Sequence, residues 1–345
     1  MKKVLSTLFM SIVSILVLFT FEQTMGENMT FWVIGEDSSF SLYHLDDQLN
    51  TEFILKADYI AYQDGTAVYL EDDGFQWTLL ALSSESDTPL RLAAGDSLTS
   101  RPVGFRIQIQ DGYAYIPVDI LDERNSVSDH YLLECSLDGA VCQEIYGLNF
   151  DIWNNFHVRN GSVYYVEMVE SDQDHVMCYD LKTGELTCLT ELDVVGFSWI
   201  SYLDQDVLWR LTQEGYFSAR DTNTIVYATG YSLKDGTISN IFLNDYKTTD
   251  DTNFWVNDGF LYCFKNRRFS EIGTVADLWE INADTGAETC VRTTLPYDNN
   301  FPPDVFFGKK GLVLSDEVYN GENYIPTLKY ISYDGRKLLE LRVPS

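Results

Sequence analysis

The chain has 345 residues, of which 53 are acidic and 23 basic, and its formal net charge is -30. A charge this negative excludes nucleic acid and anionic lipid surfaces as partners, because binding to phosphates requires Lys and Arg to displace counterions. Hydrophobic residues make up 45% of the chain and aromatic residues 14%, which is too much for a disordered acidic protein. We therefore expect a folded, acidic protein.

The N-terminus begins with two lysines, continues with an apolar stretch over residues 4–21 and ends in a short polar segment. This order is typical of a secretory signal peptide, and the small residues before Glu27 suit cleavage. We predict a signal peptide over 1–26 and a single domain over 27–345, secreted or held at the cell surface. An uncleaved N-terminal anchor is the alternative, because the apolar stretch approaches spanning length. No later segment is long and apolar enough, so we expect no membrane insertion after signal cleavage.

Seven segments then repeat the same order of elements along the chain. Each has a turn, an alternating apolar strand, a variable acidic loop, a second strand, a tight turn and a short last strand. Two copies, near Phe31 and Gln205, are weaker, and the five clear copies carry a glycine at their start: Gly65, Gly112, Gly161, Gly259 and Gly311.

Repeats of roughly 40–50 residues with three or four strands each indicate a β-propeller. We predict an all-β propeller, most simply of seven blades. Six blades stay open as the alternative, because little sequence precedes the first unit to supply its innermost strand.

One phrase occurs twice, as "YDLKTGELTC" at 179–188 and "INADTGAETC" at 281–290. It resembles the blade signature of bacterial quinoprotein-type propellers, Asp-x-x-Thr-Gly-x-x-x-Trp, with cysteine in place of the Trp. The matching positions are Asp180, Thr183, Gly184 and Cys188, and Asn282, Thr285, Gly286 and Cys290. The layout of the whole mature chain also resembles secreted bacterial propellers of unknown function related to the YWTD and TolB types, and is WD40-like in its repeats. The resemblance implies the fold. It implies no quinone, because the signature docks blades and does not ligate a cofactor, so we expect no cofactor.

Six cysteines in an exported protein indicate disulfides. A two-residue Asp-Gly turn places Cys135 directly across a hairpin from Cys142. A three-residue Lys-Thr-Gly turn places Cys178 across from Cys188. Directly opposed residues lie within disulfide range, so we predict both bonds.

The two remaining cysteines lie on strands that are not neighbours. About two strand spacings, roughly 9–10 Å, separate Cys263 from Cys290, so we expect free or buried thiols. Metal binding is the alternative use of the cysteines, but no Cys-x-x-Cys pair or Cys/His cluster occurs.

The sequence contains no local catalytic signature. The histidines are scattered, and neither a nucleophile elbow, a phosphate-binding loop nor a His-Glu-x-x-His pattern occurs. "EDDGFQW" at 71–77 holds Asp72-x-Gly74-x-x-Trp77, which resembles the Asp-box of sialidase-type propellers without its leading Ser and its Thr. An ordinary acidic β-turn explains this stretch better. The four histidines are His44, His130, His157 and His175.

Acidic loops at 70–74, 170–175 and 248–253 could offer oxygen ligands to Ca²⁺, but none has the spaced Asp-x-Asp-x-Asp-Gly pattern. We expect solvated loops and no metal site. Six tryptophans could stack on sugars, yet propellers need bulky side chains between blades, so we expect most to pack there. They are Trp77, Trp153, Trp199, Trp209, Trp255 and Trp279.

With no catalytic, cofactor or metal residues to assign, the sequence favours a non-enzymatic binding or protein-interaction module. Its blade loops and central channel would meet an extracellular protein or glycan. The alternative is a carbohydrate-active enzyme, a glycoside hydrolase or lyase, with acidic residues in the channel. The enzyme predicts two buried carboxylates roughly 5–10 Å apart, one with a raised pKa. The binding module predicts an exposed aromatic or apolar patch without that pair.

Overall fold

Among the residues that the computed structural model describes, every element is a β-strand, and the strands form seven sheets. The structure describes residues 29–34, 39–86, 88–103, 107–148, 156–169, 173–193, 201–214, 224–246, 254–270, 273–296, 304–319 and 324–341. None of these residues belongs to a helix that is long and apolar enough to cross a membrane. The predicted signal peptide, 1–26, lies outside them.

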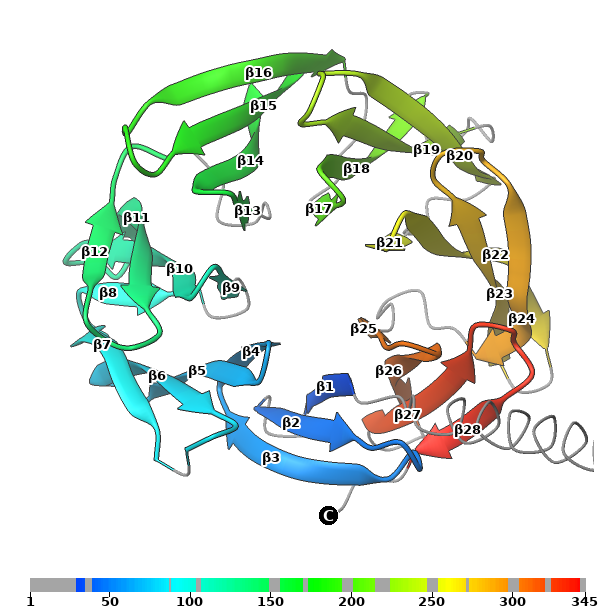
Figure 1. The fold of residues 1–345 in the computed structure, drawn as a ribbon, viewed down its shortest axis with the longest axis horizontal. Helices are drawn as coiled ribbons and strands as arrows, with labels where there is room; N and C mark the ends of the chain where they lie inside the picture. Colours follow the sequence, from blue (N-terminus) through cyan, green and yellow to red (C-terminus); the bar gives the residue numbers. More distant parts are fainter. Residues whose placement is uncertain are drawn as a thin grey trace, which may run out of the picture. The chain divides into compact units, whose positions relative to one another are not determined.

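The sheets, numbered as blades 1 to 7 in chain order, take up consecutive stretches of sequence (Figure 1). Blade 1 holds β1 (Met29–Ile34), β2 (Phe40–Leu45) and β3 (Thr51–Ala57), and blade 2 holds β4 (Tyr59–Gln63), β5 (Thr66–Asp72), β6 (Gln76–Ser83) and β7 (Leu90–Asp96). Blade 3 holds β8 (Ser100–Pro102), β9 (Gln108–Gln110), β10 (Tyr113–Leu121), β11 (Val127–Ser136) and β12 (Cys142–Ile145), and blade 4 holds β13 (Phe156–Arg159), β14 (Ser162–Val169), β15 (Gln173–Asp180) and β16 (Leu186–Asp193). Blade 5 holds β17 (Ser201–Asp204), β18 (Val207–Glu214), β19 (Thr224–Ser232) and β20 (Ile238–Tyr246), and blade 6 holds β21 (Phe254–Asn257), β22 (Phe260–Ser270), β23 (Gly273–Asn282) and β24 (Glu288–Pro296). Blade 7 holds β25 (Asp304–Phe307), β26 (Gly311–Tyr319), β27 (Tyr324–Ser332) and β28 (Leu338–Leu341).

The fold is a seven-bladed β-propeller, which confirms the prediction of an all-β propeller with seven blades. Six blades are therefore excluded. Blade 1 has three strands among the described residues, β1 to β3, where four-stranded sheets are the rule in blades 4 to 7.

The chain divides into two compact units. The first consists of Met1–Val33, Ser41–Leu55 and Pro303–Ser345, and so contains blade 7 and most of blade 1. The second consists of Ile34–Phe40 and Lys56–Pro302 and contains blades 2 to 6. Within the second unit, β13, the first strand of blade 4, contacts β9 of blade 3 and β17 of blade 5.

A turn with two positive φ values explains four of the five repeated glycines, Gly65, Gly112, Gly161 and Gly259, whereas Gly311 has no positive φ. Asp64 and Gly65 have φ values of 48° and 82°, and Asn160 and Gly161 have 51° and 74°. Two successive residues with positive φ make the type I′ turn that matches the twist of an antiparallel pair. Glycine takes the second place because it has no Cβ to clash in that conformation.

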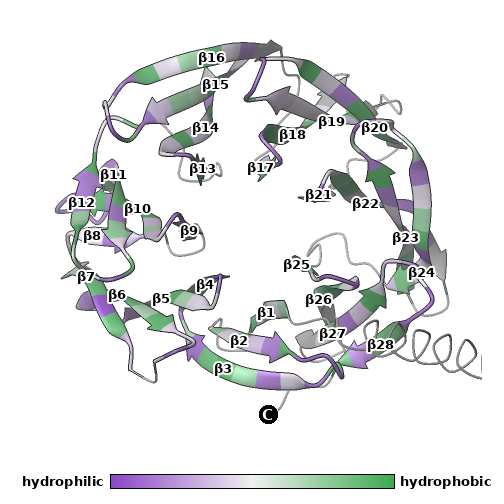
Figure 2. Cartoon of the chain, in the orientation of Figure 1, coloured by the Kyte–Doolittle hydropathy of each residue, from purple (hydrophilic) through white to green (hydrophobic). Residues whose placement is uncertain are grey.

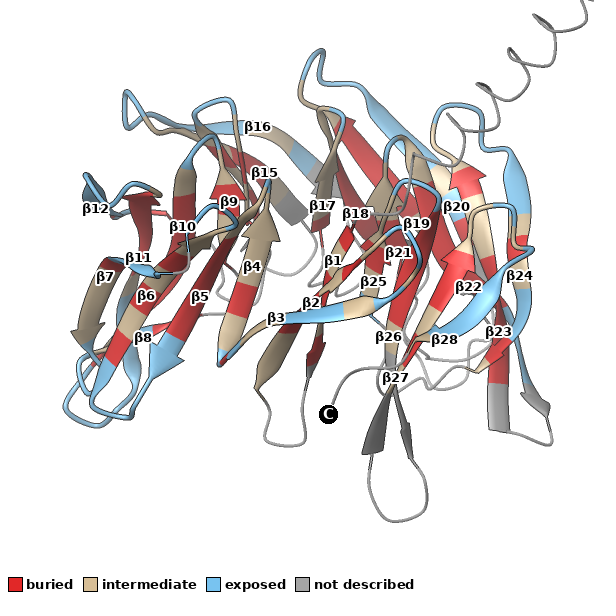
Figure 3. Ribbon diagram, turned by 60° about the horizontal axis from the view of Figure 1, so that its bottom comes forward, coloured by how far each residue is buried: buried red, intermediate tan, exposed pale blue. Residues whose placement is uncertain are grey.

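Apolar side chains between blades form the core within each unit. Strands alternate hydrophobic and hydrophilic residues (Figure 2), and burial concentrates along the middle of the strands while the turns stay exposed (Figure 3). In the second unit Trp77 and Leu79 of blade 2 pack with Ile116 of blade 3 in one cluster. In the first unit Phe31 of blade 1 packs with Phe306 of blade 7.

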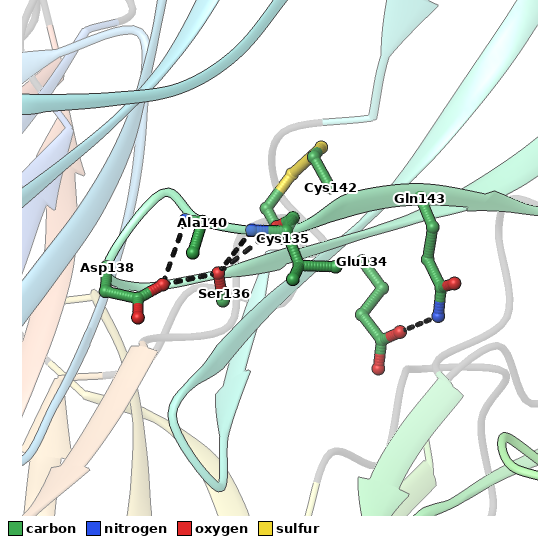
Figure 4. The surroundings of a disulfide bond; sticks show 8 residues. Glu134, Cys135, Ser136, Asp138, Ala140, Cys142 and Gln143 are labelled. Atoms are coloured by element: carbon green, nitrogen blue, oxygen red, sulfur yellow. Dashed lines mark hydrogen bonds between the residues drawn. A yellow bond between two sulfur atoms is a disulfide. The ribbon is translucent and has the colours of Figure 1, made fainter.

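The hairpin of blade 3 carries the expected disulfide (Figure 4). Cys135 on β11 stands directly across from Cys142 on β12, with 4.1 Å between their Cα atoms. The turn between them is held by Asp138, which accepts a hydrogen bond from Ser136 Oγ at 2.6 Å and one from the backbone of Ala140 at 2.9 Å. The prediction of a Cys135–Cys142 bond is therefore confirmed.

The second predicted bond is not present, and its register differs by one residue from the expected one. Cys178 pairs across the hairpin with Thr187, and both Cys178 and Cys188 are free thiols. The reason is the turn, which has four residues: the N–H of Gly184 donates to the carbonyl of Asp180 at 2.8 Å. One more turn residue than expected moves the whole pairing by one position.

The phrase that occurs twice has an architectural use. Asp180 Oδ1 accepts the backbone N–H groups of Lys182 and Thr183, at 2.9 and 2.7 Å. Asn282 Oδ1 does the same for the equivalent Asp284 and Thr285, at 3.2 and 2.9 Å. The repeated residues thus fix identical four-residue turns.

Candidate functional site

The β5–β6 turn of blade 2 is held in one conformation by its own aspartates. Asp72 Oδ1 accepts the N–H of Gly74 at 2.8 Å. Asp73 Oδ1 accepts the N–H groups of Phe75 and Gln76, each at 2.8 Å. Such side-chain bonds to the following backbone mimic a turn and stabilise it. The stretch that resembles an Asp-box is therefore a tight acidic turn, as predicted.

A second turn, between β7 and β8, is tied to the first. The backbone N–H of Ser97 donates to the carbonyl of Phe75 at 2.9 Å, and Ser97 Oγ donates to Asp72 Oδ1 at 2.8 Å. Asp96 Oδ1 accepts the N–H of Leu98 at 2.8 Å, which fixes the second turn internally. We call the two turns together, residues 72–76 and 96–100, the blade 2 tip.

The blade 2 tip presents two apolar side chains to solvent. Phe75 is 76% exposed and Leu98 is 66% exposed, the highest fractions among the large hydrophobic side chains of the described residues. The turns beneath β5 and β6 are coloured as exposed in Figure 3. Fully burying a side chain of this size is worth about 1.5–3 kcal/mol relative to leaving it in water. Two such groups on turns that are joined by hydrogen bonds favour a contact surface.

A buried tryptophan supports the tip from below. Trp77 is 2% exposed, and its Nε1 donates to Ser100 Oγ at 2.9 Å. Its ring lies over Gly95, where an added Cβ would stand 2.4 Å from Cζ2. The ring therefore joins the end of β7 to the second turn, and it confirms the expectation that this tryptophan packs inside the propeller.

The blade 2 tip is strongly acidic. Asp58 Oδ2 accepts the first backbone N–H of the β5–β6 turn at 2.9 Å, and the backbone hydrogen bonds to Asp73 lower the pKa of that carboxyl group. No Lys, Arg or His occurs in 57–90. Farther along the chain, the guanidinium of Arg101 is paired with Asp119, with 3.0 Å between Nη2 and Oδ2. Phe75 and Leu98 thus lie on turns that carry several carboxyl groups.

In the first unit, the carboxyl group of Asp304 lies beside the indole ring of Trp32. Asp304 on β25 is exposed by its surface area. Burial among its neighbours raises the pKa of its carboxyl group to about 6, and a hydrogen bond with Trp32 opposes this shift. The Trp32 ring stands edge-on to Phe306, with centroids 4.5 Å apart. This arrangement supplies one of the two carboxyl groups that glycoside hydrolysis requires.

The structure also brings together a serine and a histidine that are 44 residues apart in the sequence. His157 Nε2 on β13 lies 3.0 Å from Ser201 Oγ on β17. Ser201 is 5% exposed, and Arg210, directly across from it on β18, is 3% exposed with its pKa lowered to about 10 by burial. A serine–histidine contact is the first requirement of a nucleophilic site. Burial of the hydroxyl denies a substrate access, so we assign this group to the packing of blades 4 and 5.

The remaining candidates from the sequence are dispersed. Trp209 and Trp255 are 3% and 8% exposed, as expected for blade packing, and Trp279 stands across from both Cys263 and Cys290. Both of those cysteines are free, as predicted. Trp153, Trp199 and the loop at 248–253 lie outside the described residues. Among the residues that the structure describes, no group of three or more His, Cys, Asp and Glu side chains could hold a metal ion.

Sequence reasoning did not find the pairing of Phe75 with Leu98. The only signal was an aromatic residue placed after Asp-Asp-Gly in a turn, where polar residues are the rule. No sequence pattern indicated that Trp32 lies beside Asp304.

Comparison with known proteins shows the fold alone. No family model matches the chain, and no curated protein matches it. A puromycin-hydrolyzing peptidase from Mycobacterium tuberculosis superposes with a TM-score of 0.57 at 11% identity, covering 91% of this chain and 51% of the peptidase. An acylaminoacyl peptidase from Pyrococcus horikoshii gives 0.56 at 11% identity, covering 91% and 50%. An uncharacterized protein from Listeria monocytogenes gives 0.57 at 9% identity, covering 92% and 95%. The chain thus spans about half the length of each peptidase and nearly all of the Listeria protein.

Proposed function

We propose that this protein is a secreted, non-enzymatic binding or protein-interaction module, and that the blade 2 tip is its contact surface. The observation that carries the proposal is the pair of exposed side chains, Phe75 and Leu98, on two turns tied by hydrogen bonds. Apolar side chains on backbone turns that are already ordered require less ordering on binding, which is the property of an interaction site. The Cys135–Cys142 disulfide supports export, because such bonds persist in oxidising compartments.

The test compares the purified protein with a variant that lacks both anchors, Phe75→Ser with Leu98→Ser. Both proteins are applied to a glycan array, with Ca²⁺ and with chelator, and are used to retain proteins from the extracellular fraction of the native host. The control is Phe53→Ser, a phenylalanine that is 48% exposed on β3. We expect a glycan or protein that wild type and control retain and the double variant loses. Equal retention by all three proteins would overturn the proposal.

A carbohydrate-active enzyme is a second candidate, and Asp304 is the observation that favours it. A carboxyl group with a raised pKa beside an indole suits a general acid next to a sugar-stacking ring. This candidate predicts glycan cleavage by the wild type and its loss in Asp304→Asn, while Asp334→Asn, at an exposed turn, stays active. Absence of cleavage products by mass spectrometry, over a panel of extracellular polysaccharides, would remove it.

A further inference from the structure

The charge around the blade 2 tip limits what can cover Phe75 and Leu98. A partner that buries them must also approach Asp58, Asp72, Asp73 and Asp96, which are bonded to backbone N–H groups of the tip. The backbone hydrogen bonds to Asp73 lower the pKa of its carboxyl group, because they favour the ionised form.

An acidic or neutral apolar partner would desolvate those carboxylates without compensation. Lys and Arg side chains would pair with them and steer the encounter, since complementary charge raises association rates. An anionic membrane surface is repelled by the same charge, whereas a polypeptide can offer both cations and apolar side chains.

We infer that the blade 2 tip binds a cationic amphipathic segment of a partner protein, in which Lys or Arg residues flank a pair of apolar side chains. The inference rests on the proposed function and adds to it the chemistry of the partner. The apolar pair of the segment meets Phe75 and Leu98, and its cations meet the surrounding aspartates. The hydrogen bonds between the two turns keep both sets of groups in place before the segment arrives.

The experiment measures binding of three labelled synthetic peptides of about 15 residues by fluorescence anisotropy, at roughly 0.15 M salt where long-range attraction is largely screened. The first has a Phe-Leu pair flanked by Lys, the second replaces each Lys by Glu, and the third replaces Phe and Leu by Ser. We expect the first to bind and the other two to bind at least tenfold more weakly.

Protein variants assign that binding to the tip. Phe75→Ser with Leu98→Ser should weaken the Lys peptide at least tenfold, because truncating a central anchor commonly costs that much. Glu71→Lys, a charge reversal at an exposed residue next to the β5–β6 turn, should weaken it several-fold. Phe53→Ser should leave it unchanged. Circular dichroism checks that each variant is folded, and exposed positions should pass this check.

Two results would overturn the inference. Equal affinity of the wild type and the double variant for the Lys peptide would show that the net charge of -30 attracts the peptide without any contribution from Phe75 and Leu98. Equal or tighter binding of the Glu peptide would show that cations are not recognised. Either peptide result is compatible with a retention experiment in which a native partner is still lost when Phe75 and Leu98 are replaced. The proposed function would then stand and only the cationic partner would fall.

Discussion

Replacing Gly95 by alanine tests how the blade 2 tip is supported. The new Cβ would stand 2.4 Å from Cζ2, 2.5 Å from Cε2 and 2.7 Å from Nε1 of Trp77. Ordinary Cβ contacts are 3.4–4 Å, so restoring one requires the ring to move by about 1 Å within a filled core. Overpacking of this kind costs roughly 1–3 kcal/mol, and losing the Trp77–Ser100 hydrogen bond costs about 0.5–1.5 kcal/mol more.

We therefore expect Gly95→Ala to lower the free energy of unfolding by about 2–4 kcal/mol. With an unfolding entropy of roughly 2.1 cal/mol/K per residue over 345 residues, a loss of about 3 kcal/mol lowers Tm by about 4 °C. The assay is thermal unfolding followed by circular dichroism and by the fluorescence of the tryptophans.

Two further variants separate the steric overlap with Trp77 from backbone strain at a glycine. At Gly74 an added Cβ meets nothing within 4 Å, and only its φ of 84° opposes alanine, so Gly74→Ala should cost about 1–2 kcal/mol. Gly95→Ala combined with Trp77→Phe should recover part of the loss, because phenylalanine lacks the indole atoms that the Cβ would strike. A Gly95→Ala protein as stable as wild type, with no coupling to Trp77→Phe, would refute this reasoning.

The other predictions concern the disulfide, the raised acid and the exposed anchor. Replacing Cys135 and Cys142 by serine removes a constraint on a loop of about eight residues and should lower the free energy of unfolding by roughly 2.5 kcal/mol. Reductant should lower the Tm of the wild type by the same amount as the double substitution does. An effect of reductant on the Tm of the double variant would contradict this prediction. The pKa of Asp304 is raised from 3.8 to about 6, so the folded state binds the proton of this carboxyl group more tightly than the unfolded state does. The free energy of unfolding should therefore fall as pH rises between these values, and Asp304→Asn should flatten that slope in urea titrations. An unchanged slope in the variant would contradict this prediction. Phe75→Ser should change the free energy of unfolding by less than about 0.5 kcal/mol, and a larger loss would mean that Phe75 is part of the core.

The sequence carried enough information for the fold because local patterns repeat. Glycines at matching places, such as Gly65 and Gly161, sit in type I′ turns and set the blade count. The Cys135–Cys142 bond could be predicted since the two ends of one short turn fix the register. The prediction of a Cys178–Cys188 bond was wrong, because a three-residue and a four-residue turn differ by one backbone hydrogen bond that composition does not reveal.

The candidate site was hidden for a different reason. Its two halves, 72–76 and 96–100, are joined by the bonds of Ser97 to Phe75 and Asp72, which no periodic pattern encodes. Exposure is likewise a tertiary property, so Phe75 could equally have been a core residue on sequence grounds. The contact of His157 with Ser201 belongs to the same class, since it joins strands of two blades.

Site-specific photo-crosslinking tests the central claim most directly. Benzoylphenylalanine is introduced at position 75 or at position 53, each variant is produced in the native host and irradiated, and products are identified by mass spectrometry. The account predicts one discrete product from position 75, lost when Leu98→Ser is added, and none from position 53. Equal products from both positions, or a product from 75 that Leu98→Ser leaves unchanged, would contradict the claim that the blade 2 tip is a binding surface.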